Sequence, residues 1–189
     1  PGSGAWVKML PRLLDAARMA QEKWDPGERI SALKRAVEKA KKGDMGSCWK
    51  ESEKLLKKFA EDEDNLAAVE AFRADFTANA GKCDTQVKNW ISRGMYFVAS
   101  EYLGRQVKAY RGAPMASAWN DKVRAWRKDK VVKNLISLDE RRMKATLLME
   151  EGKRDRAVKI LRPLRKDAAG TQLETLVEET FERATMMPG

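Results

Sequence analysis

The sequence predicts an all-α protein built from antiparallel helical hairpins. Its apolar residues recur with a period near 3.6, and no segment has the strict alternation that a half-buried strand shows. Residues 140–170 give the clearest hairpin, because two apolar stripes meet there across Gly152, where a left-handed helix end needs a residue without Cβ. The first stripe is Ala145, Leu148 and Met149, and the second is Ala157, Val158, Leu161 and Leu164. We expect eight or nine helices in all.

Length and composition suit a single helical domain over residues 1–189. The chain is 43% hydrophobic and 35% charged, which is too apolar for disorder and long enough to bury a core. The only plausible subdivision is at 111–114, Arg-Gly-Ala-Pro. No apolar run approaches the ~20 residues that cross a bilayer. The opening Pro-Gly-Ser reads like the remnant of a cleaved tag, so a removed leader is compatible with this start and the compartment stays open.

Four helices are expected in the first part of the chain. A first stripe comprises Trp6, Leu10, Leu13, Ala17, Ala20 and Trp24. The run Asp25-Pro26-Gly27-Glu28 has the residues of a helix start, so a second helix should extend from there to about Lys42. The third stripe comprises Cys48, Ser52, Leu55, Leu56 and Phe59, and a fourth helix, capped by Asp64, should end at Gly81.

Later helices follow the same reasoning. Asp84 or Thr85 can cap a long fifth helix that persists to about Tyr110, with Gly94 and Gly104 tolerated inside it at modest cost. Trp119, Val123 and Trp126 then share a helix face before the hairpin at 140–170. Thr171 and Glu174 form a capping box for the last helix.

The hairpin at 140–170 resembles a known repeat family. The spacing of Ala145, Leu148, Gly152, Ala157 and Leu161 is similar to that of a tetratricopeptide-type repeat, and it recurs faintly at Ala36, Gly43 and Cys48. The resemblance implies a solenoid of stacked hairpins, whose small residues let paired helices pack closely and whose inner helices line a peptide-binding groove. An irregular helical bundle is the alternative architecture.

The residue inventory argues against catalysis. The chain contains no histidine, which removes triads, most zinc sites and proton shuttles near neutral pH. There is no glycine-rich phosphate loop, and the acidic run 61–64 lacks the ligand spacing of a calcium loop. A carboxylate enzyme stays possible, although none of the 28 acidic residues stands out. We expect no enzymatic activity, no cofactor and no metal.

The two cysteines leave two alternatives. Cys48 and Cys83 lie near the starts of the expected third and fifth helices, which lie at the same end of an up-and-down bundle. A disulfide between them is therefore geometrically possible. The other reading is two separately buried thiols, since unpaired cysteine packs as a small hydrophobe.

Positive charge is concentrated in one segment. The net charge is +10, and residues 105–166 hold 19 basic and 7 acidic residues, a difference of 12. Most of the excess falls in two clusters, one including Arg124, Arg127 and Lys128 and the other including Lys159. Such runs are usually solvated faces, but they also suit nucleic acid or another polyanion.

A groove on the inner helices would expose other side chains. The candidates are Arg141, Lys144 and Leu148 from the 140–170 hairpin, and Tyr96, Tyr102 and Arg105 from the long helix before it. Basic groove residues suit an acidic peptide or protein. We therefore expect, first, a non-catalytic protein-interaction or scaffolding module. A basic module that binds nucleic acid or another polyanion is the second reading, and a helical accessory domain of a larger cell-envelope enzyme is the third.

Overall fold

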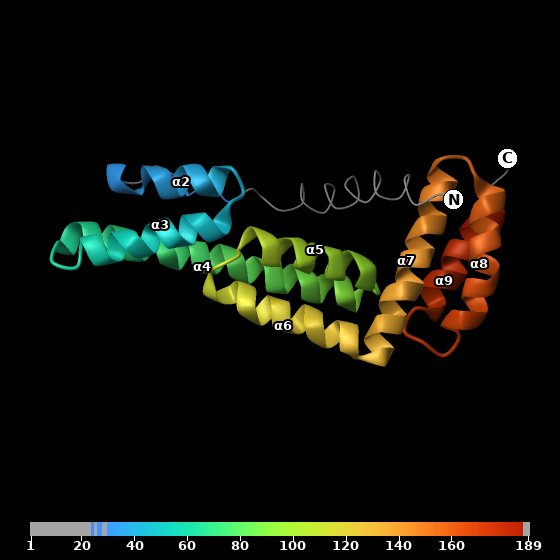
Figure 1. Cartoon of the computed structure of the whole chain (residues 1–189). Helices are drawn as coiled ribbons and strands as arrows, with labels where there is room; N and C mark the ends of the chain where they lie inside the picture. Colours follow the sequence, from blue (N-terminus) through green and yellow to red (C-terminus); the bar gives the residue numbers. More distant parts are fainter. Residues whose placement is uncertain (1–23, 25, 28–29, 187–189) are drawn as a thin grey trace. The chain divides into compact units, whose positions relative to one another are not determined.

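The computed structural model describes residues 24, 26–27 and 30–186, and it is helical through most of this range (Figure 1). The elements are η1 (Ser31–Leu33), α2 (Lys34–Lys41), α3 (Met45–Lys58), α4 (Glu63–Ser92), α5 (Tyr96–Ala109), α6 (Pro114–Lys128), α7 (Lys130–Glu150), α8 (Arg154–Ala168) and α9 (Glu174–Met186). Within the described ranges there is no strand, only an isolated bridge between Arg111 and Ala113. The all-α prediction is confirmed. The expected first helix, apart from Trp24, lies outside the described residues.

The helices divide into two compact units. Of the described residues, unit 1 contains 88–100 and 125–186, and unit 2 contains those up to 87 together with 101–124. The long helix α4 therefore contributes to both units. The turn at 111–114 lies inside unit 2, where Pro114 begins α6, so the two units do not divide there.

Unit 1 is built on the predicted hairpin. Helices α7 and α8 pack together, and α9 packs against both (Figure 1, orange to red). Their shared core is formed by small and branched apolar side chains that include Leu135, Leu138, Ala145, Ala157, Leu161, Leu164, Ala168, Leu173 and Val177. Both predicted stripes of residues 140–170 contribute to this core, which confirms the hairpin.

Unit 2 is organised around aromatic side chains. Phe72 and Phe76 of α4 are fully buried. The ring centroids of Trp24, Trp49 and Tyr110 lie 5.6, 5.3 and 5.4 Å from that of Phe76. Tyr110 in turn meets Trp119 edge-on at 5.1 Å, which ties α6 to this core.

Three turns in the described part of the chain have the same construction. Gly43, Gly94 and Gly152 have φ of 78°, 71° and 73°, and the N–H of the next residue donates to a carbonyl five residues earlier. These bonds are Asp44 to Lys39, Met95 to Trp90, and Lys153 to Leu148, at 3.0, 2.8 and 2.7 Å. Fully buried residues lie seven positions before and five positions after each glycine: Ala36, Val87 and Ala145, and Cys48, Ala99 and Ala157. The faint recurrence in the sequence thus corresponds to a turn that occurs three times.

The predicted boundary between the fourth and fifth helices is wrong. Helix α4 continues through Gly81 to Ser92, and the break occurs at Gly94 instead. A Cβ on Gly81 would meet nothing within 4 Å, so the helix passes that position without strain. At Gly94 the left-handed backbone lies against Leu173 and Leu176 near the start of α9, and this packing fixes the turn.

Other helix starts also differ from prediction. Residues 26–27 are not helical and Gly27 has φ 67°, so the second helix begins at Lys34, after η1. Asp62, rather than Asp64, accepts a hydrogen bond at the start of α4, from the N–H of Asn65 at 3.1 Å. At α9 the Thr171 hydroxyl accepts from Leu173 N–H, and Glu174 accepts from Gly170 N–H. These bonds resemble a capping box displaced by one residue.

A turn glycine and a helical glycine are expected to respond in opposite ways to the same substitution. Gly152→Ala should lower the free energy of unfolding by about 1 kcal/mol, because its left-handed φ strains any residue with a Cβ. Gly81→Ala should raise it by roughly 0.5–1 kcal/mol, since Gly81 is an exposed helical position with open space around it. Urea unfolding of both variants measures the two shifts. A more stable Gly152→Ala variant would refute the turn.

Candidate functional site

The aromatic groove candidates are core residues, so their predicted exposure is wrong. Tyr96 and Tyr102 are both buried. The Tyr96 hydroxyl donates to Oε1 of Gln172, and burial is the main cause that raises the pKa of Tyr96. The Tyr102 hydroxyl donates to Sγ of Cys83 at 3.4 Å. Both tyrosines lie on the side of α5 that also buries Ala99 and Leu103, which leaves neither ring for a ligand.

The remaining groove candidates differ in exposure and in their contacts. Arg141 of α7 pairs with Asp167 of α8, with Nη1 and Oδ2 2.6 Å apart. Leu148 packs half-buried against the core of unit 1, whereas Lys144 is exposed. Arg105 is also exposed, but it belongs to unit 2. Arg141 is thus engaged in an ion pair and Leu148 in the core, whereas Lys144 and Arg105 are exposed.

The junction between α6 and α7 combines apolar and cationic side chains. We call residues 126–132, Trp-Arg-Lys-Asp-Lys-Val-Val, the α6–α7 corner. Asp129 separates the two helices and caps α7, since its Oδ1 accepts from the N–H groups of Val131 and Val132 at 2.8 and 3.1 Å. Val131 is 69% exposed, and Met186 is the other large hydrophobic residue of the described chain with such exposure.

Two of the predicted basic candidates lie in this corner. Arg127 and Lys128 are exposed, and Trp126 and Val132 beside them in the sequence are half-buried. Arg124 is exposed one turn earlier on α6, in unit 2. Lys130 is exposed as well, so the α6–α7 corner offers an exposed branched side chain, a partly exposed indole and three cations within seven residues.

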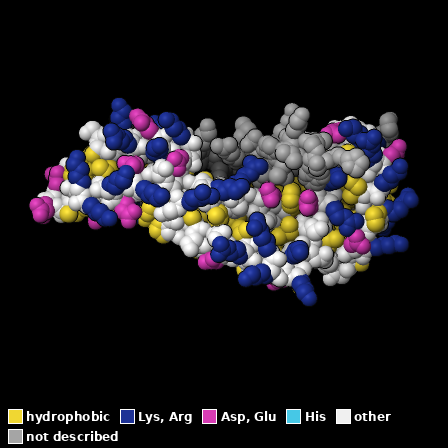
Figure 2. Space-filling model, viewed as in Figure 1, with side chains coloured by type: hydrophobic (Ala, Val, Ile, Leu, Met, Phe, Trp, Pro, Cys, Tyr) yellow, Lys and Arg dark blue, Asp and Glu magenta, His cyan; other side chains and the backbone are white. Residues whose placement is uncertain are grey.

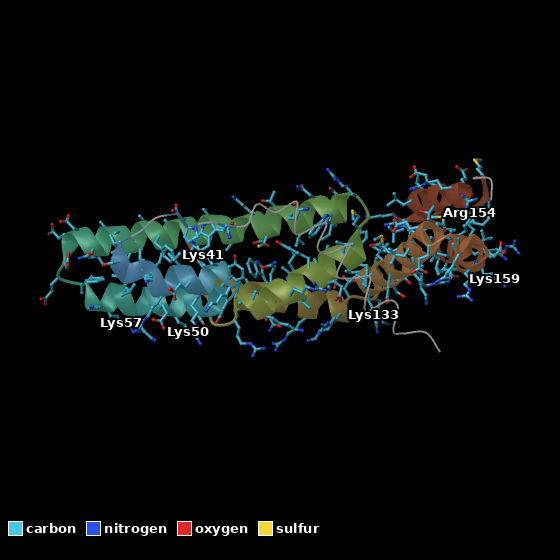
Figure 3. All side chains as sticks on the ribbon, turned by 90° about the horizontal axis from the view of Figure 1, so that it is seen from above. Lys41, Lys50, Lys57, Lys133, Arg154 and Lys159 are labelled. Carbon is cyan, nitrogen blue, oxygen red and sulfur yellow. The ribbon has the colours of Figure 1, made fainter. Side chains whose placement is uncertain are left out.

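Helix α8 has a side on which exposed cations predominate. We call Arg156, Lys159, Arg162 and Lys166, all of them exposed, the α8 outer face. At 3.6 residues per turn they fall within a sector of about 120°, opposite the buried Ala157, Leu161 and Leu164. Figure 3 shows Lys159 on the outer side of the group formed by α7, α8 and α9.

Neighbouring cations of α8 are already paired, unlike these four. Arg165 forms a two-pronged ion pair with Glu178 of α9, with both N–O distances at 2.5 Å, and stacks over the Phe181 ring. Lys153 pairs with Glu151 at 2.6 Å. Among the described residues, no acidic side chain lies within ion-pair distance of the α8 outer face. Asp155 is exposed on the same side of the helix without forming such a pair.

A buried carboxylate, which the sequence reasoning missed, ties two helices of unit 1 together. Asp139 of α7 is 0% exposed and accepts the backbone N–H of Phe97, at the start of α5, at 2.8 Å. Its other oxygen accepts from Nε and Nη2 of Arg142 at 3.1 and 2.7 Å. Burial raises the pKa of Asp139, while Arg142 and the Phe97 N–H act in the opposite direction. The one signal in the sequence was an acid four residues after Leu135, on the apolar face.

A second missed cluster lies in unit 2. The Arg73 guanidinium stacks 3.6 Å from the centroid of the Trp49 ring and donates to the hydroxyl of the buried Ser52 at 3.2 Å. Burial lowers the pKa of Arg73. Ser52 in turn donates to the carbonyl of Trp49. These contacts join α3 to α4 and leave no polar group of the three aimed at a ligand.

The cysteines are separate buried thiols rather than a disulfide. Burial, with a smaller effect from Asp44, raises the pKa of Cys48 to about 12, so the Cys48 thiolate is scarce at neutral pH. In the described part of the chain, no group of three or more Cys, Asp or Glu side chains could hold a metal ion.

Comparison with known proteins identified no relative of this chain. No family model matches the chain, and neither the curated proteins nor the solved structures that were searched contain a match. None of the helices in the described ranges has the length and apolar character needed to cross a membrane. The α6–α7 corner and the α8 outer face are the candidate interaction surfaces of the described chain.

Proposed function

We propose that the protein is a non-catalytic interaction module that binds another protein or peptide through the α6–α7 corner. The observation that carries this proposal is the exposed Val131 within a short stretch that also contains Trp126, Arg127 and Lys128. Tryptophan and arginine are enriched at protein interfaces and at the positions that dominate binding energy. The cations give the corner a preference for an acidic partner.

The architecture supports this proposal in two ways. Asp129 holds the first turn of α7 by two hydrogen bonds, so Val131 is presented on a fixed backbone rather than on a loose loop. The three turns at Gly43, Gly94 and Gly152 are also what a tetratricopeptide-like scaffold of hairpins would use. Such scaffolds present side chains from rigid helices.

The chemistry of the chain favours binding over catalysis. There is no histidine in the sequence to serve as a base near neutral pH. The Cys48 thiol is buried with a raised pKa, and the buried Asp139 is occupied by Arg142 and by the Phe97 N–H. Each of these reactive side chains has a structural partner or is inaccessible to a substrate.

The proposal is tested by capturing partners with matched surface variants. The tagged intact chain is incubated with lysate of the source organism at about 0.3 M NaCl, where attraction between distant exposed charges is screened. Wild type, Val131→Glu and Met186→Glu are compared by quantitative mass spectrometry. Met186 is the matched control, because it is 75% exposed, lies in the same unit and receives the same charge.

We expect a protein that wild type and Met186→Glu retain and that Val131→Glu loses by at least about tenfold, which corresponds to roughly 1.4 kcal/mol. Retention of all partners by Val131→Glu would remove the corner as the binding surface. Absence of any protein above background with wild type would contradict the proposed function.

A further inference from the structure

We propose that the α8 outer face binds the phosphate backbone of a double-stranded nucleic acid. This function goes beyond the protein contact proposed above and uses other residues. The observation that carries it is the row of Arg156, Lys159, Arg162 and Lys166 on the side of α8 opposite its buried stripe. All four side chains are exposed and none forms an ion pair with a described residue, although Asp155 lies on the same side of the helix.

The spacing of the row suits a linear polyanion. From Arg156 to Lys166 the helix rises about 15 Å. A nucleic acid duplex carries one negative charge per roughly 1.7 Å of its axis, so a segment of this length presents about nine phosphates. Four cations held close together on a rigid helix repel one another, and a phosphate backbone relieves that repulsion while releasing its own counterions.

The pattern of ion pairs distinguishes these four side chains from two other cations of the hairpin, Arg165 and Arg141. Arg165, on the same helix, is used to hold Glu178 of α9, and Arg141 of α7 holds Asp167. Those cations are structural. Figure 2 shows Lys and Arg side chains along the outer edge of the part that carries α7, α8 and α9.

The α8 outer face has no large apolar side chain, and this favours a nucleic acid over a protein or a membrane as its partner. The branched residues of this helix, Val158, Ile160, Leu161 and Leu164, are buried or packed against the core, and Pro163 is the exposed apolar residue nearest the row. A protein partner would be expected to use apolar anchors, and a membrane surface would require side chains that insert between lipids. A charged row alone fits a backbone of phosphates, read without regard to base sequence.

The test compares two variants that lose the same charge. One carries Arg156→Gln, Lys159→Gln, Arg162→Gln and Lys166→Gln. The control carries Lys34→Gln, Lys41→Gln, Lys42→Gln and Lys57→Gln, four exposed cations of unit 2, so both variants fall from +10 to +6. Fluorescence anisotropy with a labelled DNA duplex of about two helical turns measures Kd from about 50 to 200 mM salt. The same measurement with an RNA duplex of the same sequence shows whether the face binds DNA, RNA or both.

For wild type, the plot of log K against log salt should have a slope of about −3.6 or steeper, because four phosphate contacts on DNA give this value. The α8 variant should lose about three to four units of that slope, and the control should lose less than about one. Equal slopes for wild type and the α8 variant would overturn the proposal, as would equal losses in both variants.

Two further measurements check the folding of the variant and the class of the partner. Circular dichroism checks that the α8 variant folds. If it does not, the double variant Lys159→Gln and Lys166→Gln replaces it and should lose about half as much slope. Competition with polyglutamate at matched charge tests the partner class: displacement of the DNA at equal charge concentration would assign the α8 outer face to an acidic protein and overturn the nucleic acid proposal.

Discussion

Replacing Asp139 by alanine is expected to lower the free energy of unfolding by about 3 kcal/mol, a typical effect of removing one partner from a buried ion pair. The Asp139 side chain is 0% exposed and that of Arg142 only 12%, so the change would leave a guanidinium with little access to water. It would also leave the N–H of Phe97 without its acceptor at the start of α5. Chemical denaturation at neutral pH measures the loss.

Two companion variants separate the causes of this effect. Asp139→Asn keeps an acceptor for the Phe97 N–H, so it should cost less than the alanine variant. Removing both partners, with Asp139→Ala and Arg142→Met, should also cost less than the sum of the single changes, because no unpaired charge remains. A loss below about 1 kcal/mol for Asp139→Ala would contradict the structural role given to this pair.

The same carboxyl predicts a dependence of stability on pH. Burial raises the pKa of Asp139 above its ordinary value, so the folded protein keeps a proton that the unfolded chain has already released. The stability contribution from this group should therefore fall as pH rises from the ordinary pKa to the raised one. Comparing denaturation curves of wild type and Asp139→Asn across acidic pH isolates that contribution.

Gly46→Ala is the second substitution with a large expected effect. A Cβ on Gly46 would lie 2.1 Å from the carbonyl oxygen of Arg111, and a backbone atom cannot rotate away as a side chain can. The first turn of α3 would have to move off the turn at 111–113, at a cost of about 3 kcal/mol.

Gly104→Ala is the matched control for Gly46→Ala. Gly104 also lies in a helix of unit 2, and a Cβ there would meet nothing within 4 Å. Its substitution should raise the free energy of unfolding by roughly 0.5–1 kcal/mol. Urea midpoints give both values, and unchanged stability in Gly46→Ala would show that α3 does not approach Arg111 so closely.

Local patterns were sufficient to predict the helices and the 140–170 hairpin, but not which glycine ends α4. Gly81 and Gly94 both interrupt an apolar stripe, and their intrinsic helix propensity is the same. The choice is made by residues 173 and 176, which pack on the turn at Gly94 from about 80 positions away. Contacts at such separation leave no signal in a window of one or two helical turns.

For the candidate sites too, the sequence predicted some features that depend on neighbouring residues but not those that depend on tertiary contacts. Exposure of Arg127, Lys128 and Lys159 was expected because dense runs of charge are usually solvated, and the structure agrees. Tyr96 and Tyr102 are buried and bond to Gln172 and Cys83, which are partners from other segments that periodicity within α5 does not identify. Which cations pair with acids, as Arg165 does with Glu178, also depends on tertiary structure.

The most direct test of the account is site-specific photo-crosslinking in the source organism. The full chain carries p-benzoylphenylalanine at position 131 or, in the control, at position 186, two exposed apolar positions of unit 1. An interaction module that binds through the α6–α7 corner should give a crosslinked protein of defined mass from position 131 and none of that mass from position 186. Identical crosslinks from both positions, or none from position 131, would contradict the claim that this corner is the binding surface.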